Sequence, residues 1–313
     1  MLSYLIRRIG SGVVLLAIVA TITFVMLFGA TENVAQNILG ENATDEQIVA
    51  LEQRLGLDRP LLAQYGTWLS GAVTGDLGTS WLQSERVSTI LSHRVPVTLS
   101  MVSIAIVVIA VVSAVLGIVA AVRGGWADKT IQVLSIVGFS MPNFWLGLIL
   151  VVFFALTLRW FPATGYVSFF SSPVGWISSL TLPVAAIVLS GIASASQQIR
   201  GAVIDVLKQD YVRTLRARGI SPKSVLIRHA LRNALPAALT VLSVQFIALL
   251  GGAAIIERVF AIPGLGSLTV QASLSGDIPV VMGVVVTAIV IVVVVNVVID
   301  IIHAWVNPKV RLS

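Results

Sequence analysis

Runs of apolar residues long enough to cross a bilayer constrain this chain more than any other feature. Hydrophobic residues make up 57% of its 313 residues, and charged residues only 11%. A helix crosses the hydrocarbon core with about 20 apolar residues, and a soluble domain has about 25% charged residues. The sequence therefore predicts an all-α polytopic membrane protein with six transmembrane helices. The predicted spans are 9–29, 97–122, 131–157, 181–199, 236–256 and 280–302.

The distribution of Lys and Arg predicts the orientation of these spans. With the N-terminus inside, the cytoplasmic segments hold 14 of the 20 basic residues, as the positive-inside rule requires. Arg7 and Arg8 precede the first span as in a signal peptide, but its apolar run is too long and no cleavage site is evident. We therefore expect an uncleaved helix and two cytoplasmic termini. The predicted cytoplasmic segments are 1–8, 123–130, 200–235 and 303–313.

Several kinds of chemistry are excluded by what the sequence lacks. It contains no cysteine, which excludes disulfides, thiolate metal sites and cysteine nucleophiles. No Gly-Lys-Ser/Thr phosphate loop is present, so the chain is not expected to bind ATP. Asn296, Asp300 and His303 share a helical face, but one histidine and one carboxylate make a poor metal site. The sequence thus predicts neither an enzyme nor a metal protein.

The composition changes in the external segment 30–96, where acidic residues gather. Thr44 and Gln47 have the spacing of a capping box, and Gly56 suits a helix end, so a helix over 45–55 is expected. A second element begins near Pro60, and Gly75 to Gly78 form a turn. Residues 1–96 are predicted as one domain, the first helix plus this segment, and 97–313 as a five-helix core.

Two interpretations of the external segment compete. One is a cap or a contact for a protein that delivers a ligand from outside. The other is an amphipathic segment lying at the outer interface, with Trp68 and Trp81 as anchors. The two interpretations are compatible.

A basic block, residues 200–235, lies between the fourth and fifth spans. Its apolar positions predict one helix over 200–217, ended by Gly219. Ser221 is a good N-cap and Pro222 a good first residue for a second helix, which leads into the fifth span. The block contains eight basic residues: Arg200, Lys208, Arg213, Arg216, Arg218, Lys223, Arg228 and Arg232.

Three functions for this block are considered. A DNA-reading helix pair has the right size and charge, but tethering at both ends hinders entry into a groove. Retention by topology and by anionic lipid headgroups explains part of the charge. The third function is a lever that fits a groove on a cytoplasmic partner. The capped turn favours the lever, because it fixes a geometry that charge retention does not need.

Sequence motifs in this block resemble the coupling motif of permease subunits of binding-protein-dependent ABC importers. The motifs are Asp210-Tyr-Val-Arg-Thr-Leu-Arg-Ala-Arg-Gly219 and His229-Ala-Leu-Arg-Asn-Ala-Leu-Pro236. They are similar to the motif of the peptide/nickel permease branch. The rest of the chain is similar to the first (B-type) of the two permeases of that branch. Arg213, Thr214 and Leu215 depart from the general family pattern. Such departures are usual in the peptide branch, but that branch tends to have alanine where this chain has Leu215. Further motifs are Leu55–Pro60, Gly75–Ser80, Pro96–Leu99, Pro142–Gly147, Phe161–Tyr166, Gly251-Gly252, Glu257–Phe260, Pro263–Gly266, Asp277–Pro279 and Asn307–Arg311. After the first span the chain has Gly29-Ala-Thr-Glu-Asn33 in place of the family's Pro-Gly-Asp-Pro-like turn.

The resemblance implies alternating access driven by partners in a bacterial-type cytoplasmic (inner) membrane. The implied partners are a second permease, two cytoplasmic ATPase subunits that bind ATP and Mg, and an external substrate-binding protein. No cofactor is implied for this chain. The residues that the motif places in the ATPase-coupling region are Asp210, Tyr211, Arg213, Arg216, Ala217, Arg218, Gly219, Ser221 and Pro222.

The expected substrate is an oligopeptide or dipeptide. Nickel chelates or glutathione-like solutes are alternatives within the same family, and a non-transport scaffold or a channel is an alternative outside it. Polar residues inside spans are costly and often functional, which gives candidates for the substrate path: Asn143, Gln197, Gln198, Gln245 and Asn296. Each can instead bond to a neighbouring helix. The loop 257–279 is a candidate external gate or a plain interfacial loop, and its candidate gate residues are Glu257, Phe260, Pro263, Gly264 and Gly266.

Overall fold

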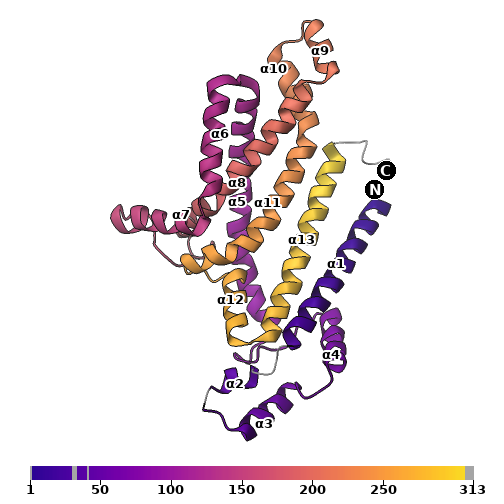
Figure 1. Cartoon of the computed structure of the whole chain (residues 1–313), viewed down its shortest axis with the longest axis vertical. Coiled ribbons are helices and arrows are strands. Elements are labelled where there is room, and N and C mark those ends of the chain that lie inside the picture. The colour runs from indigo at the N-terminus through magenta and orange to yellow at the C-terminus, as the bar shows by residue number, and fades with distance from the viewer. Residues whose placement is uncertain (1, 30–33, 41, 307–313) are drawn as a thin grey trace. The chain divides into compact units, whose positions relative to one another are not determined.

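The computed structural model describes residues 2–29, 34–40 and 42–306, and these are mainly helical (Figure 1). Within them there is no strand, only an isolated bridge between Thr79 and Arg86. The predicted all-α class is therefore confirmed. The α-helices are α1 (Leu2–Phe28), α2 (Val34–Leu39), α3 (Asp45–Leu55), α4 (Leu61–Thr74), α5 (Val87–Arg123), α6 (Gly125–Ser140), α7 (Asn143–Leu150), α8 (Pro173–Leu207), α9 (Asp210–Ala217), α10 (Pro222–Ser224), α11 (Leu231–Val259), α12 (Leu265–Ser275) and α13 (Ile278–Val306).

Among the described residues, five helices are long and apolar enough to cross a membrane, and a sixth candidate is bent. The five are Ile6–Phe28, Val87–Arg123, Pro173–Leu207, Pro222–Val259 and Ile278–His303.

The bent candidate replaces the straight span predicted over 131–157. It consists of α6 and the segment Asn143–Thr157, which meet at 93°. Met141 at the break is extended, with φ −88° and ψ 125°. The following Pro142 disfavours helical geometry at Met141 and donates no hydrogen bond of its own. The predicted number of six spans holds only when this bent pair is counted as one span.

Contacts divide the chain into two compact units, which are described separately. One comprises 1–98 and 263–294, and the other comprises 99–262 and 295–313. The division predicted from sequence between residues 96 and 97 stays a prediction.

In the first unit, helix α1 packs against α4 through aromatic side chains. The fully buried Phe24 stacks on Phe28 with ring centroids 4.0 Å apart, and it meets Tyr65 edge-on. The Tyr65 hydroxyl lies 2.6 Å from Thr21 Oγ1. Aromatic pairs of this kind add to the energy of apolar burial. Trp68 and Trp81 are half-buried beside the same cluster, and their role as interfacial anchors stays a prediction.

Helix α3 follows the sequence signals closely. Thr44 and Gln47 form the predicted reciprocal capping box at the start of α3, and Gly56 ends that helix in the left-handed conformation. Because both signals act within one turn of backbone, neighbouring elements do not override them.

A buried carboxylate in the same unit connects the turn after α4 to the start of α13. Asp277 accepts a hydrogen bond from Ser80 Oγ at 2.5 Å and another from the Trp81 N–H at 3.1 Å. Asp277 is only 2% exposed. Ser80 Oγ in turn accepts the Gln83 N–H at 2.9 Å. These bonds fix the turn that Gly75 and Gly78 introduce.

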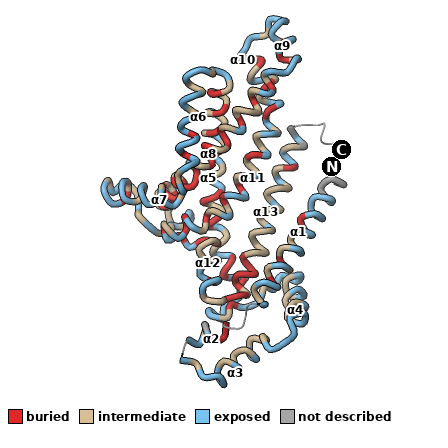
Figure 2. The backbone as a smooth tube through the Cα atoms, in the orientation of Figure 1, coloured by how far each residue is buried: buried red, intermediate tan, exposed pale blue. Residues whose placement is uncertain are grey.

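In the second unit, α8 is the central helix, and Figure 2 shows buried residues along its length. It contacts α6, α7 and α11. Two glycines permit close approach to α5: a Cβ at Gly191 would collide with the Ile109 side chain, and one at Gly117 would lie 2.8 Å from the Ser196 carbonyl oxygen. Small residues at such contacts let helices pack in lipid.

Two segments of this unit are π-helical, with turns wider than those of an α-helix. They are η2 (Val151–Thr157) after α7 and η3 (Val225–Ala230) between α10 and α11. Such turns are uncommon and occur often at functional sites.

Candidate functional site

The basic block forms a short helix that is separate from the helix before it. Helix α8 ends at Leu207, and Gln209 is extended with ψ 148° before α9 begins at Asp210. The prediction of one helix over 200–217 is therefore wrong. An acidic residue in the first turn stabilises a helix N-terminus, so Asp210 favours a new start where the polar residues Lys208 and Gln209 interrupt the apolar stripe.

The turn that follows α9 has the predicted geometry. Gly219 has φ +79°, a left-handed conformation that costs other residues about 1–2 kcal/mol. Ser221 caps the next helix by accepting the Ser224 N–H at 3.4 Å, and Pro222 is its first residue. The chain then continues through η3 into α11, so the turn is joined directly to a membrane-length helix.

Helix α9 is anchored to the bundle on one side. Its Val212 is fully buried, and Tyr211 packs against an apolar cluster between α8 and α11. The Tyr211 hydroxyl accepts a hydrogen bond from Asn233 Nδ2 at 2.9 Å. These contacts join α9 to both long helices. The buried cluster consists of Ile199, Val203, Val206, Ala230 and Ala234.

The other side of α9 presents positive charge. Arg213 and Asp210 form an ion pair at 3.5 Å, but both side chains are more than three-quarters exposed, so the pair adds little stability. Arg216 and Arg218 are exposed, and no described carboxylate lies within ion-pair distance of either. Ala217 is also exposed. The exposed arginines suit contact with an acidic surface.

A bidentate ion pair joins the start of α6 to the C-terminal part of α8. Arg200 Nε lies 2.5 Å from one Asp128 carboxylate oxygen, and Arg200 Nη2 lies 2.6 Å from the other. Both side chains are partly buried, at 24% and 15% exposure. The two parallel bonds fix the relative orientation of guanidinium and carboxylate.

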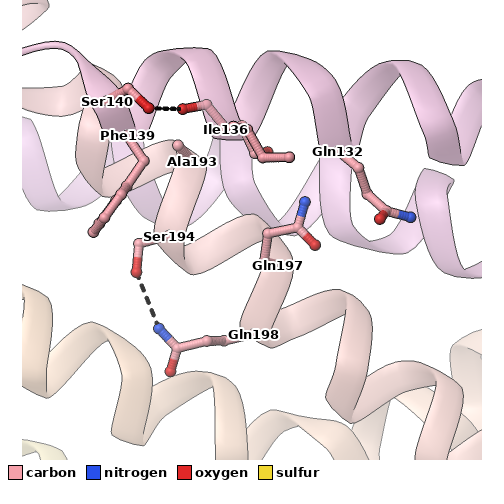
Figure 3. A pocket seen from close by; sticks show the side chains of 9 residues that line it. Gln132, Ile136, Phe139, Ser140, Ala193, Ser194, Gln197 and Gln198 are labelled. Atoms are coloured by element: carbon pink, nitrogen blue, oxygen red, sulfur yellow. Dashed lines mark hydrogen bonds between the residues drawn. The ribbon is translucent and has the colours of Figure 1, made fainter.

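A cavity of about 430 Å³ lies between α6 and α8 (Figure 3). Gln197 and Gln198 line it from α8, together with Gln132 from α6. Gln198 Nε2 donates to Ser194 Oγ at 3.2 Å. A carboxamide both donates and accepts hydrogen bonds, so this wall can bind a polar solute that carries amide groups. The remaining lining residues are Ser135, Ile136, Phe139, Ser140 and Ala193.

The structure does not gather the other predicted path residues around this cavity. The Gln245 Oε1 atom lies near Gly191, and Asn296 accepts a hydrogen bond from Ser243 Oγ at 2.8 Å. Asn143 is the first residue of α7. Sequence reasoning missed Gln132, although its helical spacing from Ser135 and Phe139 was a usable signal.

The segment predicted as an external gate loop is largely helical. Glu257 is fully buried within the last turns of α11, and Phe260 is 2% exposed. The Phe260 ring covers Gly147, and its carbonyl accepts the Gly165 N–H at 2.8 Å. The prediction of a loop over 257–279 is therefore wrong, because the burial of Glu257 and Phe260 outweighs the loop signals in the sequence.

The remaining predicted gate residues belong to the other unit. Pro263 precedes α12, Gly264 is the N-cap of that helix, and Gly266 lies within it. Of the predicted motifs, residues 30–33 and Asn307–Arg311 lie outside the described residues. Within the described ranges no cluster of three His, Cys, Asp or Glu side chains could hold a metal ion.

Comparison with known proteins gives matches along the whole chain. A peptide transport system permease protein of Brucella abortus (strain 2308) is 39% identical over 99% of each chain. A dipeptide transport system permease protein of Bacillus subtilis (strain 168) is 33% identical over 100% of this chain and 99% of its own. A glutathione transport system permease protein of Shigella boydii serotype 4 is 34% identical over 99% of both.

A solved structure has the same fold over most of the chain. It is an inward facing conformation of the MetNI methionine ABC transporter, with a TM-score of 0.58 and 18% identity, covering 70% of this chain and 97% of the other. Residues 1–102 match the N-terminal family of binding-protein-dependent transport system membrane components. Residues 113–312 match the inner membrane component itself. The chain therefore belongs to the family of binding-protein-dependent transport system inner membrane components.

Proposed function

We propose that this chain is the permease subunit of an ATP-driven importer of oligopeptides or dipeptides. The observation that carries the substrate class is the full-length similarity to permeases named for peptide and dipeptide transport. Glutathione is the second candidate, because a permease named for its transport is almost as similar. The site adds a compatible chemistry, since a carboxamide wall can bond to the backbone of a peptide.

The coupling of transport to ATP hydrolysis is assigned to the turn around Gly219. In this proposal, helix α9 and the capped turn at Ser221 and Pro222 fit a groove on a cytoplasmic ATPase. Arg216 and Arg218 pair with acidic residues there, while Tyr211 transmits the motion to α11 through Asn233. Two such ATPases, a second permease and an external binding protein complete the assembly, and ATP and Mg bind to the ATPases.

The substrate path is assigned first to the cavity between α6 and α8. Gln197 and Gln198 have the strongest claims among the predicted path residues, because both line this cavity together with Gln132. Asn143, Gln245 and Asn296 stay predictions, as do the gate roles of Glu257, Phe260, Pro263, Gly264 and Gly266. The external segment 30–96 is proposed as a contact for the binding protein.

The assembly is tested by purification in mild detergent followed by mass spectrometry of the intact complex. We expect two ATPase subunits and a second permease to accompany the chain. A well-folded preparation without any ATPase would overturn the importer assignment and favour a scaffold or a channel.

The substrate class is tested by uptake into cells that carry the complete system. Labelled dipeptides and longer peptides should enter and compete with each other, whereas glutathione and nickel chelates should compete weakly. Gln197→Leu should reduce peptide uptake more than Gln245→Leu, which removes a carboxamide that does not line the cavity. Equal uptake by these two variants would remove the cavity from the path, and dominant glutathione uptake would select the second candidate.

A further inference from the structure

A second cavity, of about 530 Å³, lies between the basic block and the ends of α5 and α8. Its polar lining is entirely cationic: Lys208, Arg216 and Lys223. All three residues are exposed, and no described carboxylate lies within ion-pair distance of their side chains. Three neighbouring cations without a counter-charge attract an anion.

The rest of the cavity is apolar. Ala121 and Val122 belong to the last turns of α5, and Ile204 and Leu207 to those of α8. Pro222 and Leu226 come from α10 and η3. Helix α5 ends one residue after Val122, at Arg123. Cations around an apolar floor, at the end of a span, match a ligand that has an anionic head and a hydrocarbon tail.

We propose that this cavity binds the phosphate headgroup of an anionic phospholipid, with the start of an acyl chain against Val122 and Leu226. The proposal rests on the orientation proposed above, which places the cavity at the cytoplasmic leaflet, where anionic lipids are enriched. It goes beyond transport, because the lipid would connect α9 and α10 to α5 and α8 and thereby restrain the coupling turn. Lipid composition would then modulate how strongly ATP hydrolysis drives uptake.

The position of the cations distinguishes this site from diffuse attraction to the membrane. Arg213, Arg218 and Arg228 are exposed in the same block but do not line the cavity. Diffuse attraction depends on the number of charges, whereas a headgroup site depends on which charges are present. The block therefore supplies a control with the same loss of charge.

The experiment measures which lipids remain bound to the complete complex after extraction from nanodiscs of phosphatidylglycerol and phosphatidylcholine. Native mass spectrometry gives the ratio of the two lipids in the wild type, in K208Q/R216Q/K223Q and in the control R213Q/R218Q/R228Q. Each cavity cation removed should lower phosphatidylglycerol retention by about fivefold. The control should retain it nearly as well as the wild type. Lys223→Gln alone gives a milder readout should the triple variant assemble poorly.

Two further measurements separate a lipid from a soluble phosphate. Val122→Asn places a polar group on the half-exposed apolar floor, so it should weaken phosphatidylglycerol binding without affecting binding of inorganic phosphate. Millimolar inorganic phosphate should fail to displace the lipid. Equal losses in the two triple variants would mean diffuse attraction, and displacement by inorganic phosphate would mean a soluble anion; either result overturns the proposal. Since the readout is lipid retention, its failure is distinct from a failure of peptide uptake.

Discussion

Asp277 illustrates how one buried carboxylate can organise a turn. Its two acceptor bonds, from Ser80 and Trp81, would both be lost in Asp277→Ala, leaving two donors without a partner. Such a loss costs about 1–3 kcal/mol of the free energy of unfolding. We expect a lower unfolding temperature for purified Asp277→Ala. The control is Asp76→Ala, which removes an exposed acceptor of the Gly78 N–H; equal destabilisation by both variants would contradict this account.

The pair of Arg200 and Asp128 makes a second prediction at the residue scale. Each single variant, Arg200→Ala or Asp128→Ala, leaves a partly buried charge without its bidentate partner, so both should destabilise the contact of α6 with α8. The exchange Asp128→Arg with Arg200→Asp should restore part of the loss, because the opposite charges still meet. Thermal unfolding of the wild type, the two alanine variants and the double alanine variant forms a double-mutant cycle, and the exchange variant is compared with the two alanine variants. A coupling of zero would show that the pair contributes nothing.

The turn at Gly219 is the element on which the proposed coupling depends. Gly219→Val forces a β-branched residue into the left-handed region, at a cost of at least about 1–2 kcal/mol. We expect the variant to assemble with its ATPases yet to show peptide uptake reduced several-fold relative to ATP hydrolysis. Gly219→Asn, which tolerates this conformation better, should be milder. Gly201→Ala, where a Cβ meets no atom within 4 Å, is the control.

Elements whose signals are local could be predicted from the sequence, and elements decided by tertiary contacts could not. The caps of α3 and the turn from Gly219 to Pro222 lie within a few residues, and they are confirmed. The burial of Phe260 against Gly147 depends on packing between distant segments. The same holds for the site: Gln197 could be selected as a polar residue in a span, but its meeting with Gln132 required the contact of α6 with α8.

For the whole molecule, the absence of cysteine makes the orientation directly testable. A single cysteine introduced at the exposed Gln209 should react with a membrane-impermeant maleimide only in inside-out vesicles. One introduced at the exposed Gln53 of α3 should react only in intact cells or right-side-out vesicles. The expectation follows from the distribution of basic residues. The reverse pattern would place the basic block outside and exclude its contact with a cytoplasmic ATPase.

The π-helical segment η3 has a consequence for how motion could pass from α9 into α11. A wide turn holds one residue more than an α-helical turn, and one residue corresponds to about 100° of rotation about a helix axis. If the wide turn shifts along the chain, the residues that it passes rotate about the helix axis. The helix on either side stays intact. In the proposed coupling, segment η3 would convert a pull on α9 into a screw-like change of side-chain register along α11.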